Sequence, residues 1–106
     1  LRPSGIRRLI VGLAGGRCMV RGCGACAEFD RTWGAGASNA IVEVHHLEEV
    51  ARVVDHHPRN LCVLCGNHHR FVHRRGAWSV DHDGPNVVLR RQAKELTIER
   101  AAGVFA

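Results

Sequence analysis

The chain has 106 residues, with 12 glycines and 5% aromatic residues, so it suits one small domain that needs a metal or disulfides to supplement its core. A net charge of +5, carried almost entirely by arginine, favours a polyanionic partner, although a merely soluble basic domain would have the same charge. Five cysteines exclude a complete disulfide framework, and no apolar run approaches the ~18 residues of a membrane span.

The first predicted element is a helix over Pro3–Leu13, because apolar residues recur there at helical spacing and Gly15-Gly16 follow. The segment Cys18–Cys26 is predicted to be a tight, glycine-punctuated loop, and Thr32–Asn39 a small polar loop. Alternating β-branched residues then predict a strand over Ala40–His46.

The central part of the chain predicts a loop, a strand and a helix. Leu47–Pro58 is polar and ends in proline, which predicts a loop with room for a helical turn. The apolar run Leu61–Leu64 predicts a short buried strand. A helix is expected over Gly66–Arg75, and Gly76 ends it.

The C-terminal part predicts a hairpin and a last helix. Trp78–Asp81 and Val87–Arg90 flank a turn-rich segment with the sequence HDGPN, which is typical of two antiparallel strands. The segment Gln92–Ala102 is predicted to be a terminal helix. All these elements are expected to belong to one domain that covers residues 1–106.

Cysteines and histidines are spaced as metal ligands. Eight histidines beside an odd number of cysteines favour metal binding over disulfides, and with it a reducing, cytoplasmic compartment. Cys65 and His68 form one short-spaced pair at the start of the expected helix, as in tetrahedral zinc sites. The second pair is either Cys18 with Cys23 or Cys23 with Cys26, and spacing alone slightly favours the latter. Cys62, inside an apolar strand, is interpreted as a small buried hydrophobic residue.

A second group of histidines has the spacing of a catalytic site. His69 and His73 are four apart and therefore share one helix face. The adjacent His45 and His46 end a strand and point to opposite sides, so one can bind a metal while the other acts as a base. Asn60 precedes the next strand and can tie down a loop through its amide. Phosphodiester hydrolysis needs such a cation and such a base.

In these residues the chain resembles the HNH endonuclease family, the ββα-metal nucleases. The segment VHHL at residues 44–47 is similar to the first histidine motif of the family, Asn60 to its central asparagine, and LCGNHHRFVH at residues 64–73 to its final helix. The resemblance covers about residues 17–80. It implies an α+β fold of the zinc-stabilised ββα-metal type, flanked by the N-terminal helix and a C-terminal hairpin and helix.

Two further segments, RCMVRGC and HHRFVHRRGAW, resemble an HNH subgroup with a C-x4-C motif before the histidines. That resemblance implies that the structural zinc ligands are Cys18, Cys23, Cys65 and His68, with Cys26 as the alternative ligand.

The family resemblance also implies a function, the metal-dependent hydrolysis of DNA phosphodiester bonds to 5′-phosphate and 3′-hydroxyl ends, with double-stranded DNA as the expected partner. His46 corresponds to the general base, and Asn60 to the residue that holds its loop. His45, where many members have Asp, and His69 correspond to ligands of the catalytic ion, and His73 to a third ligand or a phosphate contact. Arg70, Arg74 and Arg75 are expected to face nucleic acid. Mg²⁺ or Mn²⁺ is the expected ion, although imidazole ligands also suit Zn²⁺, Ni²⁺ and Co²⁺.

Two other functions fit the same motifs. The first is a non-catalytic, zinc-stabilised module that binds nucleic acid or a protein. The second is one piece of a larger phage or restriction assembly, poorly active alone. Separately, the start at Leu1 rather than Met predicts a fragment or a processed form.

Overall fold

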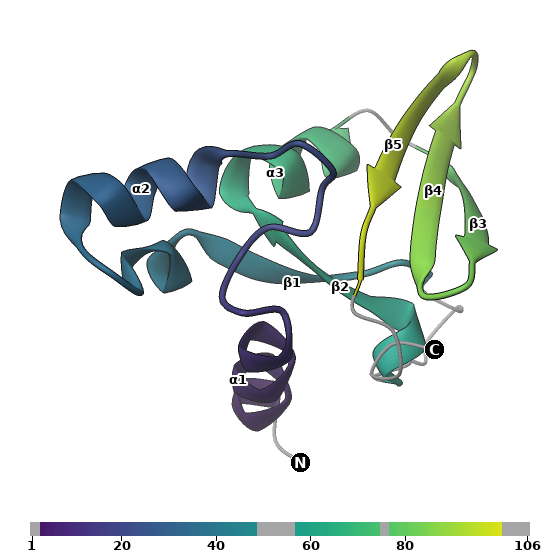
Figure 1. Ribbon diagram of the computed structural model, residues 1–106. Helices are drawn as coiled ribbons and strands as arrows, with labels where there is room; N and C mark the ends of the chain where they lie inside the picture. The colour runs from purple at the N-terminus through teal and green to yellow at the C-terminus, as the bar shows by residue number, and fades with distance from the viewer. Residues whose placement is uncertain (1–2, 49–56, 75–76, 101–106) are drawn as a thin grey trace.

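A computed structural model describes residues 3–48, 57–74 and 77–100, and these residues form a small α+β domain (Figure 1). The expected α+β class is therefore confirmed. The helices are α1 (Pro3–Leu13), α2 (Ala25–Trp33) and α3 (Gly66–Arg74), with 3-10 helices η1 (Ala37–Ala40) and η2 (Pro58–Asn60). The strands are β1 (Val42–His46), β2 (Leu61–Cys65), β3 (Ser79–Asp83), β4 (Asn86–Arg91) and β5 (Lys94–Ile98). None of the helices in the described ranges is long and apolar enough to cross a bilayer.

An antiparallel hairpin of β1 and β2 leads directly into α3. Val42 pairs with Cys65 and His46 pairs with Leu61, so the histidines that end β1 lie opposite the start of β2. Helix α1 and helix α3 lie on opposite sides of this hairpin (Figure 1). The helix expected over Pro3–Leu13 is confirmed, and Arg7 of that helix donates a 2.8 Å hydrogen bond to the carbonyl of Val42.

A second sheet contains β3, β4 and β5 in that order. The predicted hairpin is confirmed, with Val80 opposite Leu89. The helix expected over Gln92–Ala102 is wrong in its described part, because β5 runs antiparallel to β4 and Gln92 adopts a positive φ of 57° in the turn between them. Ile98 is fully buried opposite Val87, so pairing with a distant strand outweighs the local helix propensity of this segment.

Helix α2 was not predicted, and it replaces parts of two expected loops. Cys26 and Thr32 lie within α2, and η1 follows in the segment expected to be a polar loop. The sequence gives no start signal, since the N-cap Gly24 offers no side-chain hydrogen bond. Tertiary contacts hold the helix instead: Cys26 is buried, and the carboxylate of Asp30 accepts a 2.7 Å hydrogen bond from the backbone N–H of Ser38.

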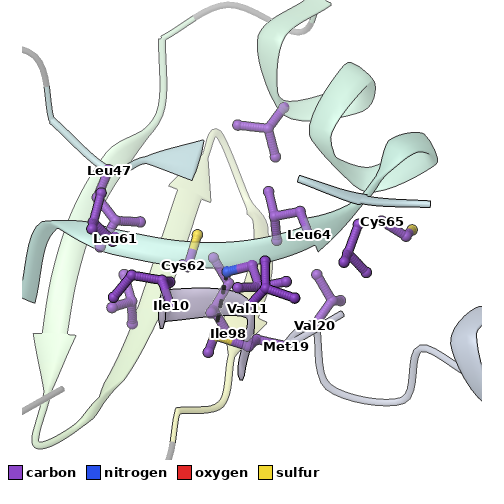
Figure 2. Packing of buried hydrophobic residues seen from close by; sticks show 14 of the residues in the cluster. Ile10, Val11, Met19, Val20, Leu47, Leu61, Cys62, Leu64, Cys65 and Ile98 are labelled. Carbon is purple, nitrogen blue, oxygen red and sulfur yellow. Dashed lines mark hydrogen bonds between the residues drawn. The ribbon is translucent and has the colours of Figure 1, made fainter. Parts of the chain in front are cut away.

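The core is centred on β2, whose five residues are all buried. Figure 2 shows Ile10 and Val11 of α1, with Met19 and Ile98, gathered beside this strand. Fully burying an aliphatic side chain of this kind contributes roughly 1.5–3 kcal/mol. Cys62 is fully buried as expected, and burial raises the pKa of its thiol to about 12.

Backbone hydrogen bonds hold the loop that carries Cys18 and Cys23, the cysteine loop, between the two sheets. The N–H of Met19 donates to the carbonyl of Val63 at 2.9 Å, and the carbonyl of Met19 accepts from Glu99 at 2.8 Å. The N–H of Arg21 donates to the carbonyl of Thr97 at 2.9 Å. The segment between the first two cysteines is therefore held by β2 on one side and by the end of β5 on the other.

Candidate functional site

Four side chains from three parts of the chain form a cysteine–histidine cluster. Cys18 and Cys23 come from the loop before α2, Cys65 ends β2, and His68 lies in the first turn of α3. Their ligand atoms all lie within 4.8 Å of one another. The Nδ1 atom of His68 is 3.3 Å from the Sγ of Cys65 and 3.6 Å from the Sγ of Cys18.

Cys26 lies outside this cluster, although spacing alone slightly favours it as a ligand. Its thiol is buried on α2, with 2% of the residue exposed, and accepts a 3.3 Å hydrogen bond from the backbone N–H of Cys18. Of the two cysteine pairs left open by the sequence, the structure thus brings Cys18 and Cys23 to Cys65.

The cysteine–histidine cluster has the donors of a structural metal site. Three thiols and one imidazole are a common ligand set of structural zinc. Burial, together with the neighbouring Cys65 and Cys23 thiols, raises the pKa of Cys18 to about 12, so a bound cation is needed to keep a thiolate at this position. Burial also lowers the pKa of His68, which leaves its imidazole neutral and able to bind a metal.

A second cluster contains His45 of β1 with His69 and His73 of α3. The ligand nitrogens of the three lie within 4.8 Å of one another. The Nε2 atoms of His69 and His73 are 3.0 Å apart, and the ring of His45 packs edge-on against both, with centroids at 5.2 and 5.0 Å. The i, i+4 spacing on α3 places two of these rings on one face, as the sequence predicts.

His45 is the buried member of this histidine cluster, with 8% of its surface exposed. Burial, together with the nearby imidazoles of His69, His73 and His46, lowers the pKa of His45 to about 4. The ring is therefore neutral at physiological pH. A neutral ring is the form in which histidine binds a metal.

Glu43 is a member of the site that the sequence interpretation missed. Its carboxylate contacts the Nδ1 atom of His69. With Nδ1 bound to the carboxylate, the Nε2 atom of His69 faces His73. In metal sites such a carboxylate fixes the tautomer and orientation of the ligand imidazole. The signal is in the sequence, because Glu43 and His45 are two apart on a strand and so share a face.

A hollow of about 230 Å³ opens beside the histidine cluster, and His45, His46 and His73 border it together with Trp78. His46 does not belong to the cluster of three. His46 thus lies next to the cluster and borders the same hollow.

Asn60 joins the segment after β1 to the segment before β2. Its Nδ2 donates to the carbonyl of Glu48 at 2.8 Å, and its Oδ1 accepts from the N–H of Glu48 at 2.9 Å. Its own carbonyl accepts from Leu47 at 2.8 Å. These bonds fix the backbone immediately after His46.

Arg100, which was not predicted, binds the backbone on both sides of Asn60. It is buried, and its guanidinium donates to the carbonyls of Arg59 at 2.9 Å and Leu61 at 3.0 Å, which flank Asn60. A third bond of 2.6 Å reaches the carbonyl of Pro85. No local sequence pattern signals such an arginine, since its partners are distant backbone carbonyls.

The arginines expected to face nucleic acid lie on α3 where the structure describes them. Arg70 and Arg74 are exposed, and Arg75 lies outside the described residues. One helix therefore presents His68 to the cysteines, two histidines to His45, and arginines to solvent. Comparison with family models, with curated proteins and with solved structures found no match to this chain.

Proposed function

We propose that the chain is a metal-dependent endonuclease that hydrolyses phosphodiester bonds of DNA, with the ββα-metal arrangement of the HNH family. The observation that carries the proposal is the convergence of three imidazoles, within 4.8 Å, at a hollow that a fourth histidine also borders. Strand β1 supplies His45 and His46, and helix α3, which directly follows β2, supplies His69 and His73.

In this proposal His45, His69 and His73 hold a catalytic divalent ion, and Glu43 orients His69. Mg²⁺ or Mn²⁺ is the expected ion, and Zn²⁺, Ni²⁺ and Co²⁺ also suit imidazole ligands. Such an ion supplies positive charge to the phosphate and to the leaving oxygen. The neutral state of His45 supports its role, because the ring has no proton to lose before binding.

His46 is the general base of the proposed reaction. It takes a proton from a water molecule as the water oxygen bonds to phosphorus, and the bond from phosphorus to the 3′ oxygen breaks. The 3′ oxygen then gains a proton from solvent, which leaves a 3′-hydroxyl and a 5′-phosphate. The bonds from Asn60 to Glu48 support this role, since they fix the backbone that follows His46.

The remaining features act as scaffold and as phosphate contacts. A structural zinc bound by Cys18, Cys23, Cys65 and His68 joins the cysteine loop to β2 and α3. Arg70 and Arg74 on the exposed side of α3 meet DNA phosphates, which agrees with the net charge of +5.

A plasmid nicking assay across Mg²⁺, Mn²⁺, Ni²⁺, Co²⁺ and Zn²⁺ tests the proposal. His46→Ala should lower the cleavage rate about 10²- to 10⁴-fold while DNA binding survives, because it removes only proton transfer. His82→Ala is the matched control, since His82 is exposed on β3 outside the histidine cluster. Full activity of His46→Ala would refute the assignment of the base. DNA binding without nicking in any of the ions would instead favour the non-catalytic zinc module.

A further inference from the structure

A second hollow, of about 320 Å³, lies next to the histidine hollow and has no part in the function proposed above. It is lined by Phe71, Trp78, Arg91, Gln92 and Lys94. Trp78 borders both hollows, so the two are neighbours that share one side chain. The volume is at the lower end of the ~300–1,000 Å³ typical of small-ligand pockets.

Two aromatic rings form one wall of this second hollow. The rings of Phe71 and Trp78 are 6.0 Å apart between centroids and tilted by 56°. The indole N–H of Trp78 donates a 3.0 Å hydrogen bond to the carbonyl of Val72, which fixes the ring against the last turns of α3. Phe71 remains 43% exposed, so part of its side chain is accessible from solvent. Exposed aromatic faces of this kind are stacking platforms for nucleobases.

The rest of the described lining carries positive charge. Arg91 and Lys94 are register partners on β4 and β5, on either side of the turn that contains Gln92. The neighbouring Arg90 is paired with the carboxylates of Asp81 and Glu95. Within residues 3–48, 57–74 and 77–100, by contrast, neither Arg91 nor Lys94 makes a salt bridge, and the hollow has no acidic lining residue. This combination matches an anion attached to an aromatic ring.

We propose that this second hollow holds one unpaired nucleotide, with its base stacked on Phe71 and Trp78 and its phosphate at Arg91 and Lys94. The inference rests on the proposed nuclease function and names its substrate. A base within a duplex is covered on both faces by its neighbours, so only a nucleotide that has left the stack can enter. The preferred substrate is therefore DNA that is single-stranded or locally unpaired beside the scissile phosphate, rather than continuous duplex.

The binding test uses a labelled single-stranded oligothymidylate and zinc-loaded His46→Ala protein, so that binding is measured without cleavage. Phe71→Ala should weaken binding about fivefold to 100-fold, and Phe71→Trp should restore it, because base stacking on an aromatic ring has that magnitude. Trp33→Ala is the matched control, since Trp33 is an aromatic residue on α2 that is 71% exposed. Arg91→Gln and Lys94→Gln should each reduce the salt dependence of binding by about 0.7 in the logarithmic slope.

A local readout comes from tryptophan fluorescence. The chain has two tryptophans, so Trp33→Phe leaves Trp78 as the single emitter. The oligonucleotide should quench this emission, and a blunt duplex at the same concentration should not. Absence of quenching, or a Phe71→Ala affinity equal to that of Trp33→Ala, would overturn the proposal. If Phe71→Ala does not fold, as judged by zinc content and circular dichroism, Arg91→Gln and Lys94→Gln decide the test.

A cleavage series separates this inference from the function on which it rests. The protein with His46 intact should cleave a duplex with an unpaired segment faster than a continuous duplex, and Phe71→Ala should lose that preference. Cleavage with equal preference in both proteins would refute the nucleotide site and leave the nuclease function standing. Quenching of Trp78 without cleavage in any divalent ion would refute the nuclease function and leave the nucleotide site standing.

Discussion

Under the proposed function, replacement of a single zinc ligand should unfold this domain, because the bound ion would join the loop of Cys18 and Cys23 to β2 and α3. Cys18→Ser leaves three of the four ligands in the cluster. Structural zinc contributes about 10–16 kcal/mol of apparent binding free energy in zinc-finger peptides. Small domains have a total unfolding free energy of about 5–15 kcal/mol. The free energy lost with zinc is therefore comparable to the whole unfolding free energy of the domain.

Cys26→Ser is a sharp control for this prediction. Cys26 is a buried cysteine on the same segment, and its thiol contacts the backbone of Cys18 without joining the cluster. The substitution should keep one zinc and cost about 1–3 kcal/mol. For a chain of this size each kcal/mol lowers the melting temperature by about 4–8 °C, so a cooperative transition should survive.

The assay is zinc content together with thermal unfolding followed by circular dichroism. Cys18→Ser should bind no zinc and show no cooperative transition. Cys26→Ser should bind zinc and unfold in a cooperative transition. Equal zinc content and equal melting temperatures in the two variants would refute the assignment of Cys18 as a ligand. Retention of the helix signal after the wild-type protein is stripped with a chelator would refute the dependence of the fold on zinc.

Two further predictions concern the histidine cluster. Glu43→Gln should weaken the binding of Mn²⁺ or Co²⁺ about 10- to 100-fold, measured by calorimetry, because it removes the charge that orients His69, while the zinc content stays unchanged. Glu48→Gln is the control, since it keeps the backbone bonds to Asn60. Equal metal affinities of the two variants would contradict the role of Glu43. The contribution of His45 to the unfolding free energy should be constant above pH 6.5 and fall as the pH drops toward about 4, because in this range His45 binds a proton in the unfolded chain but stays neutral in the folded protein. The loss of stability across this pH range is about 3 kcal/mol, at ~1.36 kcal/mol per pKa unit. In denaturant unfolding of zinc-loaded protein, the unfolding free energy of His45→Gln should therefore fall less steeply with pH than that of the wild type. The same pH dependence in both proteins would contradict the lowered pKa.

The parts of the site that lie on one element could be predicted from the sequence. Helical periodicity places His69 and His73 on one face, and it turns His68 toward another. The turn residues around Gly84 predict the hairpin of β3 and β4 because they constrain the backbone locally. In each case the determining interaction spans only a few residues.

The parts that depend on distant contacts could not be predicted in this way. The choice between Cys18 and Cys26 is made by α2, a helix without a capping signal that buries one of the two thiols. The strand conformation of β5 comes from its pairing with β4, and its local composition favours a helix. Arg100 binds carbonyls that lie about forty residues away in the chain, so no spacing rule would reveal it.

The backbone bonds from Met19 and Arg21 also govern the order in which the domain can form during synthesis. Their partners lie in β2 and at the end of β5, so the cysteine loop has its full anchorage only after β5 has left the ribosome. Until then the emerging chain carries thiols on a loop that lacks its final support. Strand β5 thus completes the support of the first ligand pair, and truncation before β5 should impair metal capture by Cys18 and Cys23.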